Sequence, residues 1–325
     1  MNCNEGILRE RTNTGYSAYN GLQIQFRTSN LWKQLTLTTN YTYSKTTDNV
    51  SEIFSTFGGG NTIAFSQNPL NFTTAEHGLS GLNIPNLWTV NFYEQLPIFR
   101  SRADLVGKLL GGWGLSGNYI ISSGEPYTPV QDFASTFSGG VGSDTAFDNA
   151  FIGTFETARP FLGSASAPAT QVGIFAGDAC SLFGGPSCAL SPSALVSFNV
   201  LNQTQGATAT PVTSAQVRFI ANGGEAQSVF GTPFGNAGRN ILRDFDTNVA
   251  NFSLIKTFKI NERANVQLRS TLLNIFNHSQ YSSVDPFIED AGLSSFETGF
   301  GNTSLFPNGG AFGRRQISFG VKINY

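Results

Sequence analysis

Two of the three cysteines are close enough in sequence to bond to each other. Cys180 and Cys188 are separated by Ser-Leu-Phe-Gly-Gly-Pro-Ser, a flexible turn that lets the chain fold back on itself. Disulfides persist in oxidising compartments such as the cell envelope, so we predict a Cys180–Cys188 bridge that closes a local excursion. A metal site here would need two further soft or imidazole ligands, and the only histidines, His77 and His278, stand in other segments. We therefore expect no metal and no cofactor, and Cys3 remains an odd cysteine.

Four charged residues stand together ahead of the segment 247–258. Asp244 and Asp246 lie close in sequence to Arg239 and Arg243. Such a group can hold calcium through its carboxylates or close an ion-pair network. Exposed ion pairs contribute little to stability, and we expect these four residues to form a solvated loop face.

Catalytic patterns are absent from the sequence. There is no G-x-S-x-G, no G-x-x-x-x-G-K, no H-E-x-x-H and no C-x-x-C, and neither a triad nor a glycosidase-type pair of carboxylates has support. His278 directly follows Asn274-Ile-Phe-Asn277, and we expect it to cap the end of a strand rather than to contact a ligand. We predict no enzymatic role and no catalytic residue, so the function must lie in binding or passage.

Alternation of apolar and polar side chains marks seven segments, which have the period of a strand with one face in water. These segments cover residues 16–27, 34–45, 86–96, 112–123, 247–258, 264–276 and 315–325. Several polar positions are predicted to face a water-filled lumen and contact a solute: Gln23, Gln25, Arg27, Asn40, Asn118, Gln267 and Arg269.

The last segment alternates without a break and ends on an aromatic residue. Its apolar side includes Phe319, Val321, Ile323 and Tyr325, which we predict to act as a C-terminal assembly signal for the barrel-assembly machinery. The length and period suit a tilted strand with lipid on one side and a wet lumen on the other. Such an apolar edge would aggregate unless it closed against another strand.

Composition favours a membrane barrel. Charged residues make up only 12% of the chain, and mean hydropathy is −0.09. The sequence contains no apolar stretch of about 18 residues, the length that a membrane-spanning helix needs. No basic stripe is present, and the pI is about 5.7, so we expect no nucleic-acid partner. The long Gly/Ser/Asn-rich links 46–85, 124–246 and 277–314 alternate with short turns, as extracellular loops alternate with periplasmic turns in outer-membrane barrels.

The predicted fold class is all-β: an antiparallel up-and-down transmembrane β-barrel in the outer membrane of a Gram-negative-type bacterium. Seven strands, or eight to nine with a hairpin in the link 124–246, leave the barrel incomplete, so we expect an open sheet whose last strand pairs only with the one before it. The start, Met1 to Thr12, is no signal peptide, and the chain reads as the C-terminal part of a longer precursor. Low periodicity in 124–246 predicts weak internal packing.

Several motifs occur in an order that matches a known family. They are Gly112–Gly117, Ser123–Tyr127, Gly235–Asn240, Leu272–His278 and the aromatic end at Tyr325. Together they resemble the C-terminal barrel of TonB-dependent outer-membrane transporters, most closely the Oar-like branch, whose members carry an N-terminal carboxypeptidase-regulatory-like domain. The resemblance implies a barrel of about 22 strands around a plug domain, energised through TonB. The plug and the signal peptide are absent from this sequence, so contact with TonB is expected through a part that precedes it.

The functional prediction is therefore a fragment of a TonB-dependent transporter that binds and imports a solute. Its expected partners are outer-membrane lipid, the barrel-assembly machinery, TonB and an unknown solute. Two alternatives stay open: an adhesive or structural all-β surface protein, and a passive porin-like channel.

Overall fold

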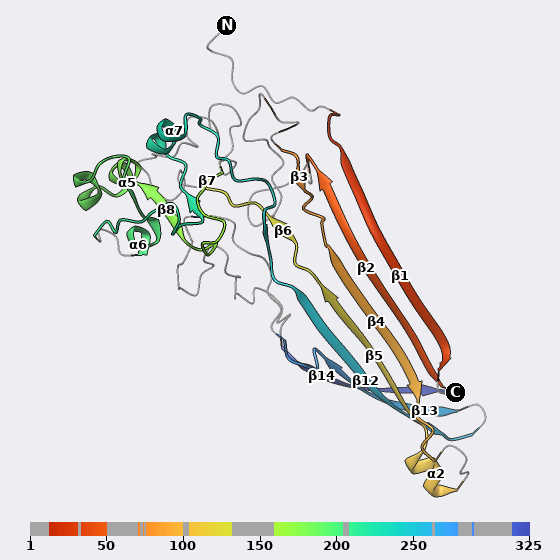
Figure 1. Cartoon of the computed structure of the whole chain (residues 1–325). Coiled ribbons are helices and arrows are strands. Elements are labelled where there is room, and N and C mark those ends of the chain that lie inside the picture. Colours follow the sequence, from red (N-terminus) through yellow and green to blue (C-terminus); the bar gives the residue numbers. More distant parts are fainter. Residues whose placement is uncertain are drawn as a thin grey trace, which may run out of the picture.

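Seven long strands dominate the structure and form one antiparallel sheet (Figure 1). The computed structural model describes residues 13–31, 34–50, 71, 74, 76–99, 104–131, 159–203, 208–261, 264–278, 288 and 314–325. The long strands are β1 (Ser17–Leu31), β2 (Leu35–Asp48), β4 (Asn86–Gln95), β5 (Trp113–Ser122), β12 (Thr247–Lys259), β13 (Asn265–Leu273) and β14 (Gln316–Asn324). Each overlaps one of the seven segments that alternation predicted.

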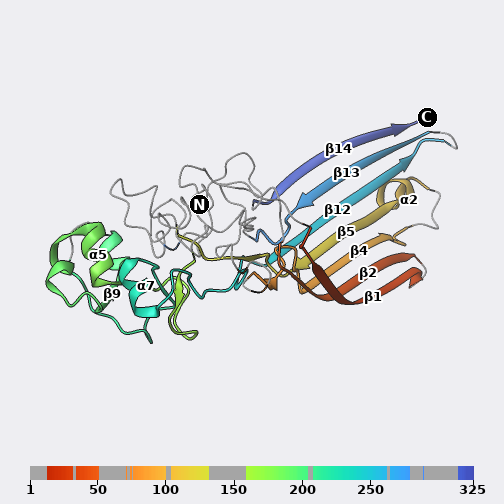
Figure 2. The same ribbon diagram turned by 90° about the horizontal axis from the view of Figure 1, so that it is seen from above.

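The strand order is that of an up-and-down sheet. The long strands follow one another as β1-β2-β4-β5-β12-β13-β14, and a short strand, β3 (Gly78–Leu79), adds to the end of β2. The sheet is curved, and among the described residues β1 and β14 are its outer strands (Figure 2). The predicted open sheet, with the last strand paired only to the one before it, is confirmed for these residues.

The register gives the sheet one polar and one apolar face. Arg27 pairs with Thr38, and the same row continues through Asn91, Asn118 and Asn251 on the next three strands. All seven side chains predicted to face a lumen occupy this side, which we call the polar face: Gln23, Gln25, Arg27, Asn40, Asn118, Gln267 and Arg269. The other side, the apolar face, carries rows such as Ile24, Tyr41, Trp88 and Ile121.

Many large side chains on the apolar face are exposed, among them Leu22, Ile24, Trp88 and Leu268. Phe319 is 82% and Val321 69% exposed on β14. Within the described residues, no protein layer covers these side chains in the way that one side of a sheet is covered in a water-soluble domain.

Aromatic side chains mark two levels of the apolar face. At one end Trp88 and Tyr119 meet edge to face with ring centroids 6.1 Å apart, and Phe276 contacts Tyr119 at 6.5 Å. Trp113 lies at the other end of β5. Trp88 is the register partner of Ile121. Ile121 lies eight residues along β5 from Trp113 (121 − 113), so the two aromatic levels are roughly 27 Å apart along the strand. A strand tilted by about 40° would reduce this separation to about 20 Å across a bilayer, near the height of an outer-membrane barrel's apolar band.

The described part of the link between β5 and β12 is folded, and for this part the prediction of weak internal packing is wrong. We call residues 159–203 and 208–246 the long-loop subdomain. Its short strands are β7 (Phe161–Leu162), β8 (Val172–Phe175), β9 (Leu195–Ser197) and β10 (Phe219–Ile220), in the order β7-β10-β8-β9. Its helices are α5 (Ala176–Phe183), α6 (Phe198–Gln203) and α7 (Gly224–Phe230), with a 3-10 turn at Gly185–Ala189.

This subdomain contains a hydrophobic core, to which Tyr127 and Ile288 from outside it also contribute. Val172, Phe198 and Phe219 are completely buried, and Phe161 stacks on Phe230 with centroids 4.1 Å apart. The strands contain two to four residues and the helices six to eight, so none is long enough to display a period in the sequence.

Two short pieces connect the subdomain to the sheet. β6 (Pro126–Tyr127) pairs with β11 (Leu242–Arg243) just beyond the ends of β5 and β12. At the opposite end of the sheet, α2 (Leu105–Leu110) stands between β4 and β5 (Figure 1). None of the described helices combines the length and the apolar character needed to cross a membrane.

Candidate solute-contacting surface

Hydrogen-bonded side chains line the polar face. Gln25 Nε2 donates to Asn40 Oδ1 at 2.8 Å, and Asn40 Nδ2 donates in turn to Thr89 Oγ1 at 3.2 Å. On the other half of the sheet, the hydroxyl oxygens of Ser253 and Thr271 lie 3.0 Å apart. Because neighbouring strands hold these groups in register, the face presents donors and acceptors in fixed positions.

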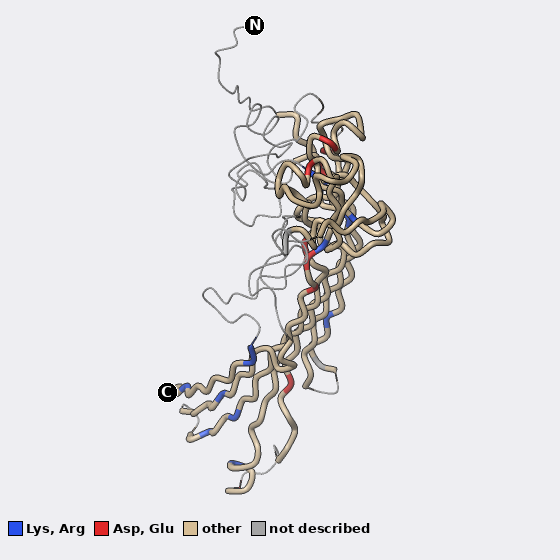
Figure 3. Tube along the Cα trace, turned by 90° about the vertical axis from the view of Figure 1, so that its left-hand side faces the viewer, with Lys and Arg blue, Asp and Glu red and all other residues tan. Residues whose placement is uncertain are grey.

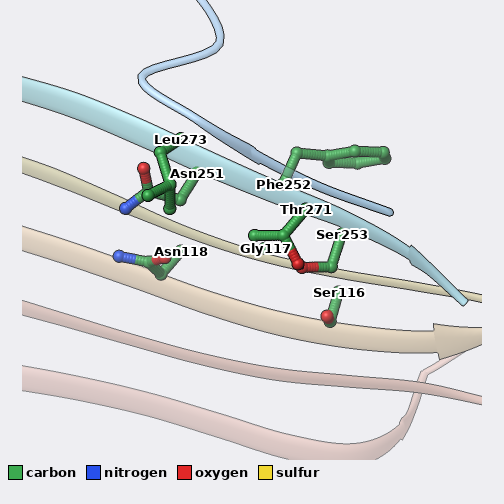
Figure 4. Close-up of a pocket in the computed structure, with 8 residues that line it drawn as sticks. All are labelled: Ser116, Gly117, Asn118, Asn251, Phe252, Ser253, Thr271 and Leu273. Atoms are coloured by element: carbon green, nitrogen blue, oxygen red, sulfur yellow. The ribbon is translucent and has the colours of Figure 1, made fainter. Parts of the chain in front are cut away.

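A hollow of about 270 Å³ lies over β5, β12 and β13 (Figure 4). Asn118 and Asn251, which are partners in the β5–β12 register, stand side by side at one end of it. Asn251 Oδ1 accepts a hydrogen bond from the backbone N–H of Asn274 at 2.9 Å, which orients the amide and leaves its NH₂ group for a ligand. The remaining lining comes from Ser116, Gly117, Phe252, Ser253, Thr271 and Leu273.

Sequence reasoning found Asn118 but missed Asn251 and Thr271 as site residues. Alternation along the segment 247–258 separates Asn251 from its apolar neighbours. Which residue of β5 it meets depends on a register set across a link of more than 100 residues, and no local turn fixes that register.

Positive charge predominates on the polar face. By their register Arg27, Lys259, Arg269 and Lys322 all occupy it. Figure 3 marks the positions of Lys and Arg along the strands in blue. Within the described strands its one carboxylate is that of Asp48, which an arginine of the long-loop subdomain engages. A water-filled interior with this charge distribution attracts anions.

Two buried ion pairs hold the long-loop subdomain against neighbouring segments. Arg239 Nη2 donates to a carboxylate oxygen of Asp48, at the end of β2, and to its backbone oxygen at 3.0 Å. Arg159 Nη2 donates to both carboxylate oxygens of Glu76, just ahead of β3. All four side chains are almost completely buried. Burial lowers the pKa of Arg239 to about 10, so the guanidinium stays charged at neutral pH.

The expectation of a solvated face for the charged group at 239–246 is wrong for Arg239, which is 4% exposed. The side chains of the other three residues hydrogen-bond to backbone groups. Arg243 Nη1 donates to the carbonyls of Asn83 and Gly124, both at 3.0 Å, and Asp246 Oδ1 accepts from the N–H of Gly124 at 3.0 Å.

Asp244 Oδ1 accepts from the N–H of the next residue, Phe245, at 2.6 Å. Burial raises the pKa of Asp244 and lowers that of Arg243. In the part of the chain that the structure describes, no three His, Cys, Asp or Glu side chains gather as metal ligands would.

The cap that we expected at His278 is present at the end of the strand, and His278 takes part in it through its backbone. Asn274 makes the cap: its Oδ1 accepts from the His278 N–H at 3.0 Å and its Nδ2 donates to the His278 oxygen at 2.7 Å. Asn274 has a φ of 49°, a left-handed conformation that asparagine tolerates. His278 contributes its backbone to the cap, and its ring contacts Phe276.

The predicted disulfide is confirmed. Cys180 of α5 is bonded to Cys188 of the 3-10 turn, with Cα atoms 4.7 Å apart. Cys3, the N-terminal residues 1–12 and all of the link 277–314 except residues 277, 278, 288 and 314 lie outside the described residues.

Comparison with known proteins agrees with this geometry. No curated protein matches the chain. The family model named "Outer membrane beta barrel domain" matches residues 4–317, almost the whole chain. The apolar face, the two aromatic levels and this match place the protein in the outer membrane of Gram-negative bacteria. The chain belongs to the outer membrane beta barrel domain family.

Proposed function

We propose that this protein binds a solute on the polar face and imports it through the outer membrane with energy supplied by TonB, as an Oar-like TonB-dependent transporter. The ordered motifs named in the sequence support this assignment. Because cations predominate on the polar face, the solute is expected to carry negative charge.

The observation that carries the proposal is the hollow at Asn118 and Asn251. It offers amide and hydroxyl groups on one wall of the proposed path, and the long-loop subdomain stands at one end of the same strands. A transporter needs such groups to bind its solute, and a folded loop that controls access to them. A scaffold or adhesin would need neither on an inward face.

The test is solute uptake by cells that make the full-length protein. Cells with and without the gene are given ferric siderophores, cobalamin, anionic glycans and peptides in turn. We expect uptake of one class, abolished when a protonophore collapses the inner-membrane potential. Asn118→Leu and Asn251→Leu should each reduce that uptake about tenfold or more, because a binding site built to hydrogen-bond a polar group discriminates strongly when its partner is lost.

Ser270→Leu is the matched control, because Ser270 lies on the apolar face opposite Phe319. It should leave uptake unchanged. Uptake that persists without the potential would identify a passive channel instead. Absence of uptake for every class, together with retained cell-surface binding, would support the adhesive alternative.

A further inference from the structure

The helix α2 exposes apolar side chains on an unusual scale for its length. Of its six residues, Leu105 is 74%, Val106 40%, Leu109 56% and Leu110 50% exposed, and Gly107 is the buried one. Ile98 and Phe99, just after β4, are 45% and 39% exposed. A helix at the surface of a water-soluble protein turns such residues toward the core.

A buried lysine binds this helix to the apolar face of the sheet. Lys256 of β12 pairs with Trp113 on one side and Leu268 on the other, and is 3% exposed. Its Nζ donates to the carbonyl oxygens of Lys108, at 3.2 Å, and Gly111. These oxygens are at the C-terminal end of α2, where carbonyls lack partners within the helix and attract cations.

Aromatic rings complete the surroundings of the same ammonium group. Its Nζ is 5.5 Å from the Trp113 ring centroid and 4.7 Å from that of Phe258, at cation–π distances. The buried ammonium thereby has both hydrogen-bond acceptors and aromatic rings around it.

Gly112 permits the close approach of this turn to the sheet. Its φ is +74°, and a Cβ atom there would lie 2.5 Å from the Thr257 carbonyl oxygen. The helix is therefore fixed on the apolar side of the sheet, at the level of the lower aromatic residues.

We propose that α2, with Ile98 and Phe99, lies in the periplasmic leaflet of the outer membrane and that phospholipid acyl chains cover its exposed apolar side chains. In this family the short turns are periplasmic and the apolar face meets lipid. The exposed apolar side chains of α2 adjoin those of the lipid-facing side of the sheet, so the two form one apolar surface. A short helix with apolar side chains and an exposed lysine, Lys108, suits the layer between acyl chains and headgroups.

The proposal is independent of solute import and is tested with nitroxide labels. The full-length protein carrying Cys3→Ser is placed in phosphatidylethanolamine and phosphatidylglycerol nanodiscs, with a single label at Leu109→Cys. We expect the ratio of collisions with oxygen to collisions with a water-soluble nickel chelate to be several-fold higher than at Glu125→Cys, an exposed site beyond β5. It should approach the ratio at Phe319→Cys on the lipid-facing strand.

A second variant, Lys256→Met, tests whether the buried ammonium group holds α2 against the sheet. Loss of the ammonium should free α2 and narrow the spectral lines of the label at 109. Heat-modifiable gel mobility will confirm that each variant is folded. A label at 109 that collides with the nickel chelate as often as the one at 125 would overturn the proposal. A label shielded from both reagents would also overturn it, in favour of a protein contact such as a second copy of the chain.

Discussion

The long-strand sheet leaves most of its large apolar side chains exposed or half-buried, whereas the long-loop subdomain buries its own in a core. Among the buried apolar residues, only Ala250 and Ile255 belong to the seven long strands. Most of the others, including Phe161, Phe198 and Phe219, lie in the subdomain or the pieces that connect it. One chain thus contains an element that needs lipid as its solvent and another that can exclude water by itself.

The largest expected effect comes from the junction between the two regions. Asp48→Ala would leave Arg239 buried without its carboxylate, and removing one partner of a buried pair costs about 3–5 kcal/mol. We expect the long loop to be cleaved much faster by protease in outer-membrane vesicles, while the sheet keeps its heat-modifiable mobility. Glu125→Ala is the control, since this carboxylate is exposed. Equal cleavage of both variants would show that the ion pair does not hold the subdomain in place.

A charge on the last strand should affect the sheet and spare the subdomain. Phe319→Arg places a cation on the apolar face near mid-strand and should cost about 2–4 kcal/mol of barrel stability. Ser318→Arg, one residue earlier on the polar face, should cost far less. Reversible urea unfolding of the full-length protein in phospholipid vesicles measures both. Similar losses for the two variants would contradict the assignment of the faces.

Reducing the disulfide should affect the subdomain and spare the sheet. The bridge closes a short loop, separation 8, so the chain-entropy account gives about 2–3 kcal/mol. Dithiothreitol should raise the rate of proteolysis within the long-loop subdomain and leave the melting temperature of the barrel nearly unchanged. The double variant Cys180→Ala/Cys188→Ala should behave like the reduced protein and no longer respond to dithiothreitol. A large drop in barrel melting temperature would assign the bridge a global role.

The smallest effect concerns pH. Asp178 accepts from the N–H groups of Glu225 at 2.8 Å and Ala226 at 3.1 Å. Burial raises its pKa above 3.8 in spite of these two hydrogen bonds. Between 3.8 and the raised value the native state holds more protons than the unfolded state, so this residue's contribution to stability falls as pH rises through that window.

Asp178→Asn isolates this contribution from those of other carboxyl groups. The difference in unfolding free energy between wild type and variant, from denaturant titrations across acidic pH, should change in that window. It should be constant at higher pH. A difference that does not depend on pH would mean that Asp178 has the same pKa in both states.

The sequence predicted the sheet well because each long strand has one face in lipid and one in water. Apolar and polar side chains therefore alternate along segments such as 315–325, and this alternation predicts where the strands lie. The subdomain could not be read in this way. Its strands and helices are too short for a period, and its core forms from residues as distant as Tyr127 and Ile288.

The candidate site was predicted in part, for a related reason. Alternation places Asn118 on the polar face, but the partnership of Asn118 with Asn251 needs the register across the long loop. Arg239 looked like one of four surface charges. Its partner, Asp48, is 191 residues away, and no local pattern connects the two.

The pairing of β5 with β12 constrains the order in which the chain folds. The N–H of Gly124 reaches the carboxylate of Asp246, 122 residues later. Closing a flexible loop of that length costs about 2 kcal/mol more than closing one of ten residues. A subdomain that collapses first brings its two ends together through β6 and β11 and removes much of that cost. Assembly of the barrel would then wait on a folding event in the aqueous phase, so a defect in the subdomain core would appear as slow insertion rather than as a weaker barrel.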